Sequence, residues 1–238
     1  MDIANELPDE KDRQRLEHLF DEELIRRSRS WFQEYSKLMA YYRCAMMEIE
    51  TKFQVLNEEF SLRYDRNPIS SIKSRLKKPE SIKAKLDKLG LPVSVQSIEE
   101  NLHDVAGVRV ICSFPEDVYL LAKALLGQDD LRLIARKDYI ADPKPNGYRS
   151  LHLIVSVPIF LAHEKRYMQV EIQLRTIAMD FWASLEHQLR YKKDFQFTEE
   201  MARDLKFCAE LSAELDRRMD GLRELVQQGP PPGEKAST

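Results

Sequence analysis

The sequence predicts an α+β protein in which four or five strands lie between helical arms at the two ends of the chain. Helical periodicity runs through residues 9–62, β-like segments follow between residues 69 and 174, and helical periodicity returns in residues 198–226. The chain has 238 residues, of which 43% are hydrophobic and 32% are charged. That length and composition suit one good-sized domain with helical extensions.

One apolar stripe defines the first helical arm. Its members recur at spacings of three and four residues: Trp31, Tyr35, Leu38, Tyr42, Ala45, Ile49, Phe53, Leu56 and Phe60. Such a stripe is typical of a long amphipathic helix. We expect a helix over residues 9–62, in two pieces. Its stripe should pack against a core or a partner, because aromatic residues this regularly spaced are not typical of a cofactor-binding pocket.

Breakers and caps divide the middle of the chain. Asn67-Pro68 ends the first arm, Pro79 suits the first turn of a helix and Gly90 suits its end. Thr176 can cap the helix that follows the last strand. We therefore expect strands at residues 69–76, 105–114, 131–140, 151–159 and 168–174, and helices at 79–89, 116–126, from 176 onward and 198–226.

A basic island interrupts an otherwise acidic chain. Residues 63–88 hold nine Lys or Arg against three Asp or Glu, a local charge of +6 in a chain of net charge −3. Arg75 and Lys77 share a face of the predicted strand, and Ser81 and Lys85 share a face of the predicted helix. Cations, a hydroxyl and a helix N-terminus together suit a polyphosphate. The alternative is a solvated helix face, which explains Arg75 and Lys77 less well.

Two carboxylates occur at β-like segments and are candidate metal ligands. Asp104 directly precedes the strand predicted at 105–114, and Glu171 lies on the polar side of residues 168–174 together with Gln173. Carboxylates on neighbouring strands can hold Mg²⁺ between phosphate oxygens. The sequence does not place the two side by side: Asp104 could be a cap, and the polar side of the strand could face water.

The segment from Lys144 to His152 reads as a nucleotide-binding turn. Asn146-Gly147 favours a tight turn, and prolines stiffen its approach. Tyr148 could stack on a base, which contributes about 1–3 kcal/mol. Lys144 and His152 could meet phosphates. An ordinary hairpin explains the Asn-Gly pair but not the whole string.

Several classes of protein are disfavoured by what the sequence lacks. No apolar run approaches the roughly 20 residues of a membrane helix, and the polar, acidic N-terminus is not typical of a secretory signal. The three cysteines form neither a disulfide framework nor a metal knuckle, so we expect a cytoplasmic protein. The HExxH, Walker and GxSxG patterns are absent.

The order of these segments resembles the synthetase domain of RelA/SpoT-type (p)ppGpp synthetases, and in particular a small, stand-alone alarmone synthetase. The resemblance spans roughly residues 63–193 and rests on residues 75–86, 104–109, 138–152, 171–176 and 181–192. It implies a mixed central sheet flanked by helices, related to nucleotidyltransferases. With this catalytic core at 63–193, the apolar periodicity leaves an N-terminal helical arm (1–62) and a C-terminal oligomerisation helix (194–228), and the Pro-, Gly- and Ser/Thr-containing tail (229–238) is expected to be disordered.

The resemblance further implies a GTP diphosphokinase of the stringent response. The 3′-hydroxyl of GTP or GDP would attack the β-phosphorus of ATP, and AMP would leave. Asp104 and Glu171 would bind Mg²⁺, and Glu171 would also take the proton of the 3′-hydroxyl. The ATP contacts implied are Arg75, Lys77, Ser81, Lys85 and Arg109. The guanosine contacts implied are Lys144, Asn146, Tyr148, His152 and Gln173.

Other properties of the family are implied more loosely. Small members are typically homotetramers, which agrees with the apolar arms, and single-stranded RNA or (p)ppGpp is a candidate regulator. Asp180 stands where many relatives have Asn, which leaves a guanosine contact there open. The rivals are a non-enzymatic RNA- or nucleotide-binding regulator, which has no use for the two carboxylates, and another nucleotidyltransferase, which usually has two close acidic residues on one strand.

Overall fold

The structure is a computed structural model that describes residues 10–64, 66–190 and 197–228. The predicted tail at 229–238 and residues 191–192, the last two on which the resemblance rests, lie outside these residues. The chain forms two compact units, one of Met1–Tyr41 with Pro79–Leu102 and the other of Tyr42–Lys78 with His103–Thr238. Each unit is described by itself.

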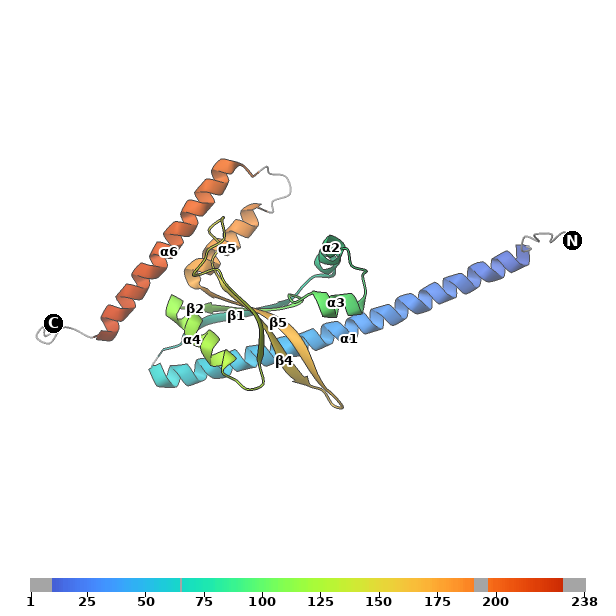
Figure 1. Cartoon of the computed structure of the whole chain (residues 1–238), viewed down its shortest axis with the longest axis horizontal. Coiled ribbons are helices and arrows are strands. Elements are labelled where there is room, and N and C mark those ends of the chain that lie inside the picture. Colours follow the sequence, from blue (N-terminus) through green and yellow to red (C-terminus); the bar gives the residue numbers. More distant parts are fainter. Residues whose placement is uncertain (1–9, 65, 191–196, 229–238) are drawn as a thin grey trace, which may run out of the picture. The chain divides into compact units, whose positions relative to one another are not determined.

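The second unit is built on a five-stranded sheet in the order β1-β2-β5-β4-β3; β1, β2, β5 and β4 are labelled in Figure 1. Its strands are β1 (Ile69–Leu76), β2 (Ala106–Cys112), β3 (Arg132–Asp138), β4 (Leu151–Phe160) and β5 (Lys165–Thr176). Strands β2 and β5 pair in parallel, and the other neighbours pair antiparallel. The expected mixed sheet is therefore confirmed, and each strand overlaps its predicted range.

Apolar alternation along the inner strands builds the core of this sheet. In β4, Leu151, Leu153 and Val155 are buried, and in β5 so are Val170 and Ile172. The residues that alternate with them, Gln169, Glu171 and Gln173, are polar and only partly buried. Because successive side chains point to opposite faces of a strand, one face of β5 joins the core and the other presents polar groups.

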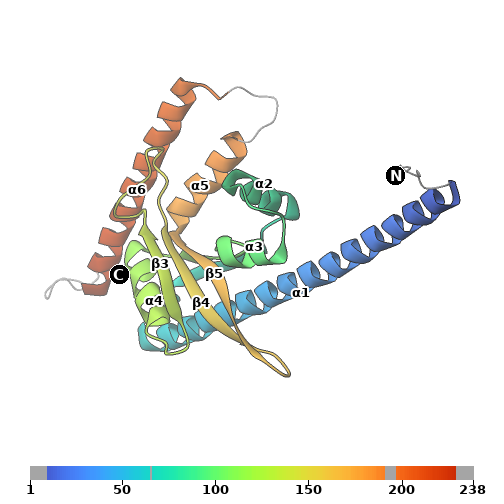
Figure 2. The ribbon, with the colours of Figure 1, turned by 45° about the vertical axis from the view of Figure 1, so that its right-hand side comes forward.

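Helices α4 (Pro115–Leu126), α5 (Ile177–Arg190) and α6 (Glu199–Gln228) follow β2, β5 and α5 in the chain. Figure 2 shows α5 and α6 side by side, and they pack closely against each other. Thr176 caps α5 as expected, because its hydroxyl accepts a hydrogen bond from the Met179 amide at 3.1 Å. Helix α5 begins directly after β5 and packs against this strand.

Helix α1 (Glu10–Tyr64) is continuous, so the prediction of two pieces was wrong. Residues 10–64 contain neither proline nor glycine, and nothing in the sequence interrupts the ladder of hydrogen bonds. Within the second unit, Tyr42, Ala45, Ile49 and Phe53 of its stripe are almost fully buried, which agrees with the predicted packing against a core.

The first unit contains α2 (Pro79–Leu89), as predicted, and α3 (Val95–Asn101), which the sequence did not predict. Helix α3 is short, and Ser94 caps it by accepting a hydrogen bond from the Ser97 amide at 3.0 Å. Within the described part of the chain, no helix has the length and apolar character needed to cross a membrane.

Candidate active site

Strand register brings the predicted polar residues into two rows on one face of the sheet. Lys73, Arg109, Gln173 and His152 are direct neighbours across β1, β2, β5 and β4. Two positions along, Arg75 on β1 and Glu171 on β5 are both opposite Gly107 of β2.

A cavity of about 240 Å³ opens over these rows. It is lined by Lys73, Ser74, Arg75, Asp104, Gly107, Val108, Arg109, Glu171 and Gln173. The structure therefore brings together Arg75, Arg109, Asp104, Glu171 and Gln173, which were predicted separately. Because Gly107 has no side chain, the row it shares with Arg75 and Glu171 stays open at its centre.

The two predicted carboxylates belong to this cavity. Asp104 lies just before β2, and Lys77 Nζ donates a hydrogen bond to Asp104 Oδ2 at 2.8 Å. The Lys77 amide is held by the Val105 carbonyl at 2.8 Å, which fixes the chain at the end of β1. The negative charge of Asp104 acts to raise the pKa of Glu171, as expected of two nearby carboxylates.

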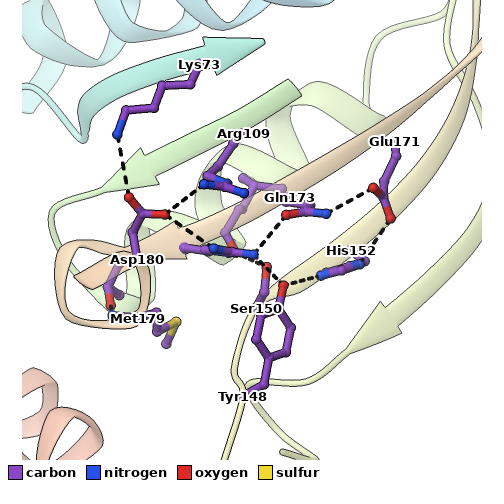
Figure 3. Close-up of polar contacts among 12 residues, drawn as sticks. Lys73, Arg109, Tyr148, Ser150, His152, Glu171, Gln173, Met179 and Asp180 are labelled. Carbon is purple, nitrogen blue, oxygen red and sulfur yellow. Dashed lines mark hydrogen bonds and ion pairs between the residues drawn. The ribbon is translucent and has the colours of Figure 1, made fainter. Parts of the chain in front are cut away.

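Glu171 is nevertheless held in its ionised form. Burial raises its pKa, but hydrogen bonds from His152 and Gln173 outweigh burial, so the pKa lies below its ordinary value. His152 Nδ1 lies 3.3 Å from Glu171 Oε1, and Gln173 Nε2 donates to Oε2 at 2.9 Å. Both oxygens of the carboxylate thus have a partner (Figure 3).

The predicted turn is present between β3 and β4. The Gly147 amide donates to the Lys144 carbonyl at 2.8 Å, and the Tyr148 amide donates to Asn146 Oδ1 at 3.2 Å. Gly147 has φ +90°, and a Cβ there would lie 2.5 Å from the Cβ of Ala209 on α6. Only glycine fits this position, because the backbone is left-handed and α6 approaches closely.

Tyr148 leaves the turn and points toward the polar face of the sheet (Figure 3). Its hydroxyl lies 2.8 Å from His152 Nε2. Lys144 Nζ lies 4.8 Å from the centre of its ring, a cation–π distance. Asn146 Nδ2 donates to Glu186 Oε1 of α5 at 3.4 Å. Lys144, Asn146, Tyr148 and His152 therefore form one group that meets the cavity through the His152–Glu171 contact.

Two residues at this site, Lys73 and Arg175, received no role from the sequence, and for a third, Asp180, the sequence left a guanosine contact open. Asp180, on α5, has an oxygen 3.3 Å from both Arg109 Nη1 and Arg175 Nη1, and Lys73 Nζ lies 3.7 Å from its other oxygen. Burial and the neighbouring Arg175 lower the pKa of Arg109, and Asp180 partly offsets them. The Asp180 carboxylate is thus surrounded by cations.

The sequence did carry a signal for Arg175. It continues the alternation of Glu171 and Gln173 along β5, and so it belongs to the same face of the strand. Ser81 and Lys85 lie on α2 of the other unit. Their part in phosphate binding stays a prediction.

Comparison with known proteins adds independent findings. Residues 74–196 match the family model described as "Region found in RelA / SpoT proteins". The chain is 43% identical over 194 residues to GTP pyrophosphokinase YwaC of Bacillus subtilis (strain 168), covering 82% of this chain and 92% of that protein.

Solved structures show the same similarity. The crystal structure of small alarmone synthetase 1 from Bacillus subtilis bound to its product pppGpp has a TM-score of 0.74 at 33% identity, covering 81% of this chain and 98% of that one. The same synthetase bound to AMPCPP has a TM-score of 0.69 at 30% identity, covering 83% and 100%.

Proposed function

Since the chain belongs to the RelA/SpoT-type small alarmone synthetases, we propose that its cavity carries out the reaction of a GTP pyrophosphokinase. The activity is that of a (p)ppGpp synthetase, which moves a pyrophosphate group from ATP to the 3′-hydroxyl of GTP or GDP and releases AMP. One observation carries the proposal. Two arginines and two carboxylates line a single cavity that adjoins the Tyr148–His152 group.

The cationic side of the cavity suits the ATP phosphates. Phosphoryl and pyrophosphoryl transfer depends mainly on positioning and on neutralising charge, because the protein supplies little covalent chemistry. Arg75 and Arg109 line the cavity, and Lys77 borders it through Asp104. We assign these three residues to the phosphates of ATP, and a part for Ser81 and Lys85 remains a prediction of the family resemblance.

The acidic side suits activation of the 3′-hydroxyl. Glu171 is ionised, and its two donors hold its oxygens in place. A fixed carboxylate beside the phosphate-binding arginines can accept the hydroxyl proton as the oxygen attacks the β-phosphorus. The electron pair of the broken P–O bond then leaves with AMP.

The turn group suits the acceptor nucleotide. The ring of Tyr148 can stack on guanine, and such stacking contributes about 1–3 kcal/mol. The sugar and phosphates of the same nucleotide can then be contacted by polar groups of Lys144, Asn146, His152 and Gln173. The proximity of His152 and Gln173 to Glu171 would bring the acceptor hydroxyl to the base.

Mg²⁺ is the cofactor that this chemistry implies, and the residues fit it. Asp104 and Glu171 line the same cavity, and their mutual repulsion is what a divalent cation relieves. Mg²⁺ is commonly held by one or two carboxylates together with substrate phosphates, and Asp104 and Glu171 can supply those carboxylates. When bound, Mg²⁺ would neutralise charge on the phosphate oxygens.

The exposed apolar face of α5 and α6 supports self-association of the chain, and the family resemblance makes a homotetramer the expected assembly. Phe181, Leu215 and Met219 are 63%, 55% and 49% exposed and line a groove of about 650 Å³. Apolar patches of this kind commonly mark protein–protein interfaces. Light scattering of the purified protein would measure the oligomer, and a monomer at micromolar concentration would contradict the assignment.

Two further assignments complete the proposal. Cys44, Cys112 and Cys208 are free thiols, which suits the reducing cytoplasm. ATP and GTP or GDP are the expected substrates, and single-stranded RNA or (p)ppGpp is a candidate regulator.

Separation of nucleotides after incubation tests the activity. The pure protein is mixed with Mg²⁺, ATP and GTP, and the products are resolved by ion-exchange chromatography. Equal amounts of AMP and pppGpp are expected. If ADP forms in place of AMP, or if neither product forms over a range of protein and Mg²⁺ concentrations, the proposed reaction is wrong.

A further inference from the structure

Arg175 lies at the branch point of the polar network on β5. Its side chain is 5% exposed, and its charge is compensated by Asp180, whose Oδ1 lies 3.3 Å from Nη1. Its other terminal nitrogen, Nη2, donates to the Tyr148 hydroxyl at 2.5 Å and to Gln173 Oε1 at 2.9 Å. A buried charge persists only with such partners, because an unpaired one costs several kcal/mol.

In the first branch, from Arg175 through Tyr148 to His152, the chemistry of the groups decides which one donates each hydrogen bond. Arginine can only donate hydrogen bonds, so the Tyr148 hydroxyl must accept from Arg175. Its single proton is then available for His152 Nε2, at 2.8 Å. A neutral His152 that accepts at Nε2 carries its proton on Nδ1, and Nδ1 faces Glu171 Oε1 at 3.3 Å. The branch runs from Arg175 through Tyr148 and His152 to Glu171.

The second branch is fixed by the same rule. Gln173 Oε1 accepts from Arg175, so its amide nitrogen is the end that faces Glu171 Oε2, at 2.9 Å. The two branches start at one guanidinium and end on the two oxygens of one carboxylate. Both oxygens of Glu171 therefore accept hydrogen bonds, as an ionised carboxylate does.

We propose that Arg175 is a positioning residue that fixes the orientation of Glu171 through Tyr148–His152 on one side and Gln173 on the other. The proposal rests on the proposed function for its kinetic consequence, because Glu171 is the base assigned there. Arg175 itself is placed four residues from Glu171 and acts only through the groups between them. The direction of the two branches stands on the contacts alone.

The position of the proton on the His152 ring of the wild-type protein tests the direction of hydrogen-bond donation. Long-range nitrogen–proton NMR of the metal-free protein distinguishes the two neutral tautomers, and loss of the signal in His152→Asn assigns it among the five histidines. The neutral ring is expected to carry its proton on Nδ1. A proton on Nε2 would reverse the first branch and overturn the proposal, whether or not the protein synthesises pppGpp.

Steady-state kinetics of Arg175→Lys test the positioning role. Lysine keeps the charge but cannot form the planar fork that reaches both branches. Loss of one charge-assisted hydrogen bond from Arg175 should lower kcat by about ten- to a hundredfold. The KM for ATP should change by less than about twofold, because ATP is assigned to other residues.

The matched control is Arg223→Lys, which replaces an arginine whose side chain is 9% exposed and is paired with Glu116 and Asp220. Its kcat should stay near the wild-type value. If both variants lose activity only in proportion to their folded fraction, Arg175 is structural and the proposal fails.

A double variant tests whether Arg175 works through the tyrosine hydroxyl. Tyr148→Phe removes the hydroxyl and keeps the ring, so it should lower kcat by itself. In the Arg175→Lys background it should add less than about a twofold further loss, because coupled residues are not additive. Full multiplication of the two losses would show that the residues act independently.

A wild-type protein that makes neither AMP nor pppGpp would refute the proposed function, and the tautomer of His152 would still decide the inference.

Discussion

Replacing Glu171 by glutamine is the substitution whose effect the site predicts most sharply. The change removes one negative charge and converts one oxygen into an amide group that donates hydrogen bonds. In the structure both oxygens of Glu171 face a donor, from His152 and from Gln173. Whichever way the new amide turns, it places a donor against a donor, so the side chain loses at least one of its two restraints.

The magnitude follows from the two roles assigned to the carboxylate. Loss of a general base lowers rate by about 10²- to 10⁴-fold, which corresponds to about 3–5 kcal/mol of barrier. Loss of one of two carboxylates that would hold Mg²⁺ adds to that figure. We therefore expect a kcat at least about a thousandfold below the wild-type value, and Asp104→Ala should be similarly inactive.

The assay is the initial rate of AMP release with saturating ATP and GTP at fixed Mg²⁺. Thermal unfolding of the same samples establishes that the variant is folded, and Glu199→Gln, an exposed substitution on α6, is the matched control. A Glu171→Gln variant that is folded and retains more than about a tenth of the wild-type kcat would refute the assignment of the base, because the lost transition-state stabilisation would then be under about 1.4 kcal/mol.

Three further outcomes follow from the structure. Tyr148→Ala should weaken GTP binding by about 1–3 kcal/mol and leave ATP binding nearly unchanged, as calorimetry would show, and equal weakening would exclude stacking on guanine. Gly147→Ala should destabilise the fold by about 1–3 kcal/mol or more in chemical denaturation, because its φ is +90° and the new Cβ would press on Ala209, whereas Gly221→Ala, with open space around it, should not destabilise the protein. Burial raises the pKa of Asp216 above its usual 3.8, so at pH values between the two the native state binds more protons than the unfolded state. The free energy of unfolding of the wild type should therefore fall as the pH rises from about 3.8 through the raised pKa. Asp216→Asn should lack this fall and gain stability relative to the wild type over the same range, and a pH-independent difference would contradict the buried carboxyl.

The strands were predictable because their signal is local. Residues 168–174 alternate between apolar and polar side chains, and the strand β5 that contains them shows the same alternation in its burial. Breakers marked the ends of elements, as Pro79 did at the start of α2. The continuity of α1 was missed although residues 10–64 contain no breaker, and α3 was missed because a short helix has too few residues for a periodic pattern.

The convergence of the site was not predictable from local pattern. Asp104 and Glu171 are distant in the chain, and they meet because β2 pairs in parallel with β5, which is a long-range connection. Arg175 was overlooked for a related reason. Its importance comes from partners on the turn and on α5, Tyr148 and Asp180, which only the folded chain brings to it.

Phosphorus NMR of the reaction tests the central claim most directly. A pyrophosphate transfer moves the β- and γ-phosphates of ATP together, so a new 3′-diphosphate on GTP should appear at the rate at which AMP forms, and Glu171→Gln should show neither signal. Appearance of ADP with a single new phosphate on the acceptor, or of inorganic pyrophosphate and AMP without a 3′-diphosphate, would contradict the assignment of this cavity to pyrophosphate transfer.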